Sequence, residues 1–301
     1  MKAKLTPEGM SIYIPEKHTT IRLESIEEIE KYTKLKVKKL PEDYPSPEIV
    51  HCEISDRCNL ACPYCYVGKK EAKELSTGEW LRIIRKLSDA GVYQITFGGG
   101  EPTMRDDLIP LAAYAKGLGL NVAMTSNGIN IPKYPQQQLR FFDQVNISYH
   151  DRPAGDSTGM PTFLNALQHL KDNGIKRGIN FCLSKKYEPL LGHIVAIAES
   201  MDAALLVLTY KPVIGDYANQ IPPAEVLKTM TALKASKCEI FVDGLTCQTC
   251  MGSKRFCDVS SVGDIYPCSF IRIPQGNLLT EEFGSIWKRR MKEVKCPYLK
   301  S

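Results

Sequence analysis

Six stretches with alternating apolar and polar residues, each followed by an amphipathic helical pattern, occupy the middle of the chain. The alternation predicts strands at residues 48–55, 93–97, 121–125, 144–150, 176–184 and 204–211. Helices are predicted at residues 76–90, 105–118, 136–142, 161–173, 187–201 and 222–236, and several end at a glycine (Gly91, Gly119 and Gly174). This strand–helix order predicts a parallel sheet, either open or curled into a barrel.

The predicted strands are polar on one face. The polar set is His51, Glu53 and Ser55; Gln94 and Thr96; Asn146, Ser148 and His150; Asn180, Cys182 and Ser184; and Thr209 and Lys211. A doubly wound sheet buries both faces, and a closed barrel fills its interior with branched apolar side chains. The pattern therefore predicts an α/β fold, a partial (βα)6 barrel curled around a polar cavity.

Three cysteines follow the first predicted strand, in the order Cys58-x3-Cys62-x2-Cys65. Thiolates in such a loop can hold three irons of a [4Fe–4S] cluster, and the missing fourth thiolate leaves one iron open to a ligand. Zinc is the alternative, but structural zinc uses four closed ligands, usually in Cys-x2-Cys pairs. The spacing favours an iron–sulfur site.

The next two predicted strands also end in unusual sequence. Residues 98–101 read Gly-Gly-Gly-Glu, and residues 125–128 read Thr-Ser-Asn-Gly. Parallel α/β folds bind ligands at the carboxyl ends of their strands. Consecutive glycines let a ligand approach the backbone, and Glu101 supplies a carboxylate for an ammonium group.

These motifs resemble those of the radical S-adenosylmethionine (SAM) enzymes, and the resemblance covers about residues 48–211. It implies that Cys58, Cys62 and Cys65 ligate three irons while SAM chelates the fourth. It implies contacts to SAM from Tyr64, Gly99, Gly100, Glu101, Ser126 and Ser148. The implied reaction is reductive cleavage of SAM to a 5′-deoxyadenosyl radical, with a low-potential donor such as flavodoxin or ferredoxin.

A second group of cysteines lies in the tail, where two short strands meet at Val262-Gly263. The spacing from Cys250 to Cys268 resembles the SPASM and Twitch extensions of radical SAM enzymes, which carry auxiliary [4Fe–4S] clusters. A full SPASM extension has a later four-cysteine run, of which only Cys296 remains. The resemblance implies one auxiliary cluster on Cys247, Cys250, Cys268 and Cys296, with Cys257 as the substitute ligand; rubredoxin-type iron or zinc is the alternative.

The predicted domains are an N-terminal segment and linker (1–47), the radical SAM partial barrel (48–236) and a small hairpin and helix domain for the auxiliary cluster (237–301). In the first, a strand pair at residues 11–14 and 20–23 precedes a helix. The proline-rich stretch 41–47 then forms a linker.

Composition narrows the class of protein. The net charge of +5 over 301 residues comes from scattered basic residues, so nucleic-acid binding is not indicated. No apolar run has the length of a membrane span, and no signal-peptide core is present. Eleven cysteines without an export signal favour a reducing cytoplasm and metal ligation over disulfides.

Several further residues have two interpretations. Cys52 and Cys238 are expected to be structural thiols, and Cys182 is a core thiol or a substrate contact. His150 is a proton relay or a rim histidine. Lys211 contacts an acidic group of the substrate or the SAM carboxylate, or is a rim lysine that extends to solvent. A charged loop with Asp151, Arg152 and Asp156 is expected to be solvated.

The sequence thus predicts oxidative modification of a peptide or protein side chain. The 47 residues before the barrel are few for a peptide-recognition domain, so dehydrogenation or cyclisation of a small molecule is the alternative. A non-catalytic iron–sulfur or zinc scaffold is the alternative of another class.

Overall fold

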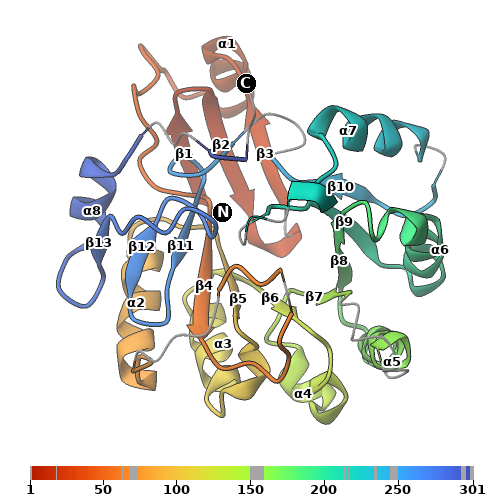
Figure 1. Cartoon of the computed structure of the whole chain (residues 1–301). Coiled ribbons are helices and arrows are strands. Elements are labelled where there is room, and N and C mark those ends of the chain that lie inside the picture. Colours follow the sequence, from red (N-terminus) through yellow and green to blue (C-terminus); the bar gives the residue numbers. More distant parts are fainter. Residues whose placement is uncertain are drawn as a thin grey trace.

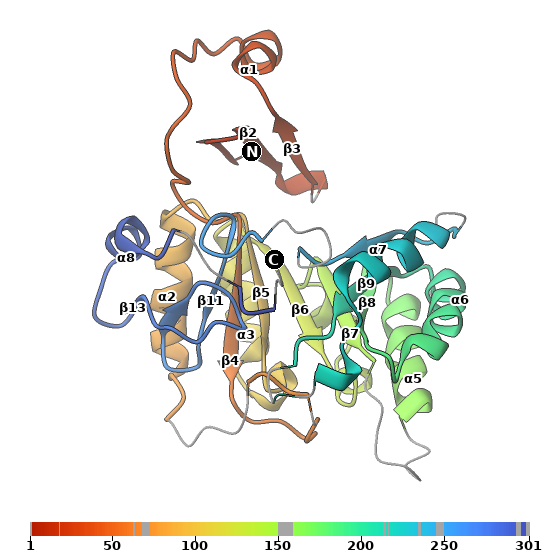
Figure 2. The same ribbon diagram turned by 45° about the horizontal axis from the view of Figure 1, so that its top comes forward.

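The computed structural model describes residues 2–17, 19–62, 64–67, 73–149, 159–212, 215, 217–233, 236–244, 250–292 and 296–298. A large sheet with helices on its outer side forms most of the molecule, and a small sheet lies at one end of it (Figure 1, Figure 2). Cys247, His150 and the loop with Asp151, Arg152 and Asp156 fall outside the described residues.

Six parallel strands lie side by side in chain order: β4 (Ile49–Ser55), β5 (Gln94–Gly99), β6 (Asn121–Ser126), β7 (Gln144–Ser148), β8 (Arg177–Leu183) and β9 (Ala204–Thr209). The helices are α2 (Thr77–Asp89), α3 (Leu108–Gly117), α4 (Gln136–Leu139), α5 (Gly159–Asp172), α6 (Leu191–Met201) and α7 (Pro223–Ala232). Short 3-10 helices cover Pro15–Lys17, Pro102–Met104, Ile131–Lys133, Glu188–Leu190 and Tyr217–Asn219. The α/β class and the partial (βα)6 barrel are confirmed.

Local sequence explains where the helices begin and end. Ser76 caps α2 through a capping box with Glu79, which satisfies amides that the first turn leaves without partners. Gly91, Gly119 and Gly174 have φ of +81°, +72° and +68°, the left-handed conformation that ends a helix.

The division of the strands into polar and apolar faces holds for β4, β5, β7 and β8. Their apolar residues face the helices and are fully buried, as Val50, Phe97 and Ile179 illustrate. In β9 the expected face is wrong. Leu206 and Leu208 pair with Asn180 and Cys182 on the cavity side, whereas Thr209 pairs with the buried Leu183. Asp243 accepts a hydrogen bond from the Thr209 hydroxyl at 3.0 Å, which satisfies that group in the buried layer.

The C-terminal strands extend both edges of this sheet. β10 (Ile240–Val242) pairs with β9, and β11 (Phe256–Val259) pairs in parallel with β4. β12 (Asp264–Tyr266) and β13 (Gly276–Asn277) continue the sheet antiparallel, and α8 (Phe283–Arg289) follows. The predicted hairpin and terminal helix are confirmed, but the pairing of β11 with β4 was not foreseen.

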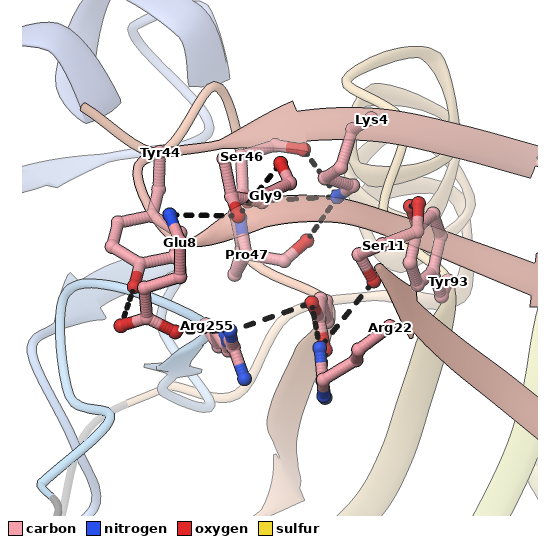
Figure 3. Close-up of polar contacts among 12 residues, drawn as sticks. Lys4, Glu8, Gly9, Ser11, Arg22, Tyr44, Ser46, Pro47, Tyr93 and Arg255 are labelled. Carbon is pink, nitrogen blue, oxygen red and sulfur yellow. Dashed lines mark hydrogen bonds and ion pairs between the residues drawn. The ribbon is translucent and has the colours of Figure 1, made fainter. Parts of the chain in front are cut away.

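An antiparallel sheet of β1 (Lys2–Thr6), β2 (Gly9–Ile14) and β3 (Thr19–Leu23), with α1 (Ile26–Thr33), forms the N-terminus. The sequence predicted all of these elements except β1. Figure 3 shows how this sheet attaches: Arg22 donates two hydrogen bonds of 2.8 Å to Glu48, and Lys4 Nζ donates to Ser46 Oγ at 2.7 Å. Because Glu48 immediately precedes β4, the small sheet lies at the opposite end of β4 from the three-cysteine loop (Figure 2). No helix in the described ranges is long and apolar enough to cross a membrane.

Candidate active site

One cavity of about 370 Å³ lies at the carboxyl ends of β4 to β7. The residues predicted to bind the first cluster and SAM all line it: Cys58, Cys62, Tyr64, Cys65, Gly99, Gly100, Glu101, Ser126 and Ser148. The order of the parallel strands brings these separate stretches to one edge of the sheet.

The glycine loop is locked against the start of the cysteine loop. Gly100 N donates to the Ser55 carbonyl at 2.7 Å, and Glu101 N donates to the Arg57 carbonyl at 2.8 Å. A Cβ on Gly99, which has a φ of +112°, would lie 2.4 Å from the Ser55 oxygen, and one on Gly100 would lie 2.3 Å from the Arg57 oxygen. The sequence suggested that these glycines admit a ligand; the structure shows that the two protein loops themselves require them.

The cysteine loop has further anchors. Glu74 Oε1 accepts hydrogen bonds of 2.8 Å from the Ser55 hydroxyl and from the Asp56 amide, which fixes the point where the loop leaves β4. Burial raises the pKa of the Cys58 thiol, and the Leu60 amide, which donates to Cys58 Sγ at 3.4 Å, opposes this effect. Three thiols on one cavity wall suit a cluster that keeps one iron open.

The carboxylate of Glu101 is buried on the wall of this cavity. It accepts hydrogen bonds from Thr103 Oγ1 at 2.6 Å, Ser126 Oγ at 2.8 Å and the Asn127 amide at 2.7 Å. Burial raises the pKa of Glu101, and these hydrogen bonds oppose the effect of burial. Ser126 therefore orients Glu101, a role that its sequence position alone did not reveal.

A buried cluster of charged residues on the cavity side of β4 was not predicted. Arg272 donates to both carboxylate oxygens of Glu53 at 2.8 and 2.7 Å, and His51 Nδ1 lies 2.8 Å from Asp258 Oδ2. The polar face had indicated that His51 and Glu53 face inward. Their partners are 207 and 219 residues away, so no local pattern identified them.

Cys250, Cys268 and Cys296 approach one another beside the hairpin. Burial raises the pKa of the Cys268 thiol, the amides of Phe270 and Ile271 oppose this, and the thiols of Cys250 and Cys296 raise it further. Cys257, the expected substitute ligand, instead lies buried in the apolar core, where burial raises the pKa of its thiol strongly.

The remaining candidate residues have structural partners. Lys211 Nζ forms an ion pair with Asp243 at 2.5 Å and lies 4.6 Å from the centre of the Phe270 ring. Cys52 is fully buried in the core, as expected, and burial raises the pKa of Cys182 to about 11. Asp243, which also accepts the hydrogen bond from Thr209, is a residue that the sequence did not single out.

Comparison with known proteins gives a consistent result. The sequence profile of the Radical SAM superfamily matches residues 52–184. The chain is 27% identical over 277 residues to PqqA peptide cyclase of Xanthomonas euvesicatoria, covering 81% of this chain and 74% of the relative. It is 26% identical over 302 residues to AdoMet-dependent heme synthase of Oleidesulfovibrio alaskensis, covering 84% and 77%.

A solved structure has the same fold. Streptococcus suis SuiB bound to its precursor peptide SuiA superposes with a TM-score of 0.74 at 14% identity, over 95% of this chain and 86% of that one. The match therefore includes the N-terminal sheet and the C-terminal strands as well as the barrel.

Proposed function

Since the chain belongs to the radical SAM superfamily and is an enzyme, we propose that it cleaves SAM reductively and oxidises a side chain of a peptide or protein. The observation that carries this proposal is the single cavity lined by three thiols, the glycine loop and Glu101. Buried charge and hydrogen-bonding groups around such a cavity can orient a ligand and exclude water.

In this proposal Cys58, Cys62 and Cys65 would hold a [4Fe–4S] cluster and leave one iron free to bind SAM. When bound, this cluster supplies the electron that cleaves SAM. Glu101 accepts the ammonium group of SAM, held in place by Ser126. Gly99 and Gly100 shape the backbone beside it, and Tyr64 and Ser148 complete the wall of the cavity.

A second [4Fe–4S] cluster is proposed at Cys247, Cys250, Cys268 and Cys296, as an acceptor for the electron that oxidation releases. The proximity of Cys268 to Cys250 and Cys296 supports this set, and the burial of Cys257 in the core argues against Cys257 as a substitute. On this assignment residues 1–47 form the N-terminal segment and linker, residues 48–236 the barrel and residues 237–301 the auxiliary domain. The strands β10 and β11 of this last domain pair with the edge strands β9 and β4 of the barrel.

A peptide substrate is supported by the similarity to a PqqA peptide cyclase and by the fold shared with SuiB, which was solved with a precursor peptide. The similar identity to a heme synthase supports the alternative, a small-molecule substrate. A flavodoxin or ferredoxin is the proposed electron donor. The proposed location is the reducing cytoplasm, because the chain has eleven cysteines that suit metal ligation.

The test is anaerobic incubation of the reconstituted enzyme with SAM, dithionite and short peptides encoded beside its gene. We expect 5′-deoxyadenosine together with a peptide that has lost the mass of two hydrogen atoms. Formation of 5′-deoxyadenosine without any peptide product, and its stimulation by a tetrapyrrole precursor instead, would favour the small-molecule alternative.

A further inference from the structure

The charged cluster beside the cavity contains a histidine with one free ring nitrogen. Asp258 Oδ2 accepts a hydrogen bond from His51 Nδ1 and another, of 2.6 Å, from the Ser269 hydroxyl. Among the described residues, His51 Nε2 has no hydrogen-bond partner. The imidazole is 12% exposed, and His51 is one of the residues that line the cavity.

Gly98 makes room for the ring. A Cβ at Gly98 would lie 2.3 Å from His51 Nε2, closer than any real contact allows. The imidazole therefore requires a glycine at position 98, just as the cysteine loop requires glycines at positions 99 and 100. This fit fixes the ring between β5 on one side and Asp258 of β11 on the other.

A carboxylate on Nδ1 determines which tautomer the neutral ring adopts. With the Nδ1 proton donated to Asp258, the lone pair of Nε2 points away from the carboxylate, which is the arrangement of a general base. We propose that His51 Nε2 accepts the proton that the substrate releases when it is oxidised, and that Asp258 positions His51 for this step.

The proposal rests on the proposed function, and it accounts for the proton and the two electrons that leave the substrate. The substrate C–H bond breaks, and its hydrogen atom passes to the 5′-deoxyadenosyl radical. The remaining substrate radical then loses one electron to an iron–sulfur cluster of the enzyme and one proton to His51 Nε2, and a new double bond forms. Oxidation of the substrate by two electrons is thereby matched by reduction of SAM and of that cluster.

The charges around His51 suit this role. Burial lowers the pKa of His51, and the charge of Arg272 lowers it as well. The charge and hydrogen bond of Asp258, together with the charge of Glu53, raise it by more. The pKa of His51 therefore lies above its ordinary value. An ordinary histidine pKa is about 6.5, so an upward shift moves it toward neutral pH, where a general base is most effective.

A labelling experiment tests the geometry without relying on turnover. Diethyl pyrocarbonate acylates only neutral imidazole, so labelling of His51 in the anaerobic holoenzyme, followed by mass spectrometry against pH, reports its titration. We expect Asp258→Asn to shift the midpoint for His51 downward by about one pH unit or more. Labelling of the exposed His193 on α6 should be the same in both proteins. An unshifted midpoint for His51, or no labelling at any pH, overturns the proposal.

Turnover provides the second test. His51→Gln should still form 5′-deoxyadenosine with substrate, but product per SAM cleaved should fall about 100-fold or more. Added imidazole should restore part of the product in His51→Ala, and His193→Gln should behave like wild type. Wild-type product yield and pH profile in His51→Gln would overturn the role of His51. Absence of 5′-deoxyadenosine from the wild-type enzyme would instead overturn the proposed function.

Discussion

Arg272 and Glu53 join the C-terminal extension to the first strand of the barrel through two hydrogen bonds, of 2.8 and 2.7 Å. Glu53 is fully buried, and Arg272 is one-quarter exposed. Removing one partner of a buried pair leaves an uncompensated charge, which is costlier than losing the attraction itself. This pair therefore couples the stability of the barrel to the position of the extension.

The first prediction concerns this pair. Arg272→Met should lower the free energy of unfolding by about 3 kcal/mol, because Glu53 loses the cation that donates to both of its carboxylate oxygens. Arg85→Met, which removes an exposed pair with Asp89, should cost less than about 1 kcal/mol. Urea denaturation of the two variants under anaerobic conditions measures the difference. Equally small losses of unfolding free energy in the two variants would contradict this prediction, because they would show that other groups compensate the charge of Glu53.

The pH dependence of that variant follows from the pKa of Glu53. Burial raises this pKa, the charge of Asp258 raises it further, and Arg272 opposes both. Without Arg272 the folded-state pKa rises more, so the folded state binds a proton that the unfolded chain has already released. Such a group favours folding at low pH and loses that contribution as pH rises through the folded pKa. Arg272→Met should therefore be less destabilising at about pH 5 than at about pH 7, and the opposite trend would contradict this account.

The glycine loop gives a second prediction. Gly99→Ala should cost about 1–3 kcal/mol or more, because the residue has a positive φ and its new Cβ would meet the Ser55 carbonyl. It should also weaken SAM binding by displacing Glu101. Gly192→Ala on α6, where nothing lies within 4 Å of the added Cβ, should instead stabilise the protein by about 0.5–1 kcal/mol. Thermal unfolding of both variants and SAM titration of Gly99→Ala check these outcomes.

The third prediction is that variants of Glu101 and Ser126 weaken SAM binding to different extents. Glu101→Gln should weaken SAM binding by about 1.5–3 kcal/mol, since a neutral amide replaces the acceptor for the ammonium group. Ser126→Ala removes one of the hydrogen bonds to Glu101 and should cost about 0.5–1.5 kcal/mol of the same affinity. Calorimetric titration with SAM measures both. Unchanged affinity in Glu101→Gln would assign Glu101 a purely structural role.

Much of the fold was predictable because the local alternation in β4, β5, β7 and β8 is regular and several helices end at glycines. The cavity residues were predictable because they directly follow those strands. The pairing of β11 with β4 was not, since a four-residue strand carries no signal for its partner. His51–Asp258 and Glu53–Arg272 depend on that pairing. The prediction for Thr209 was wrong because a polar side chain at a strand end was assigned to the cavity face. Thr209 lies on the opposite face, where Asp243 accepts the hydrogen bond of its hydroxyl.

The fourth prediction separates the auxiliary ligands from Cys257. Cys268→Ala should lower the iron content of the anaerobically reconstituted protein from about eight to about four per chain, preserve some 5′-deoxyadenosine formation and abolish product. Cys257→Ala should retain all the iron, because its thiol lies in the apolar core. Iron loss in Cys257→Ala with a normal fold would return Cys257 to the ligand set, and normal product from Cys268→Ala would reduce the second cluster to a structural role.

Formation of 5′-deoxyadenosine from SAM and dithionite is the measurement that tests the central claim most directly. The reconstituted wild-type protein should form 5′-deoxyadenosine and methionine if, as proposed, Cys58, Cys62 and Cys65 hold the cluster that donates the cleaving electron. The variant with all three replaced by alanine should keep about four irons and form none. Cleavage retained in that variant, or S-adenosylhomocysteine as the main wild-type product, would contradict the account.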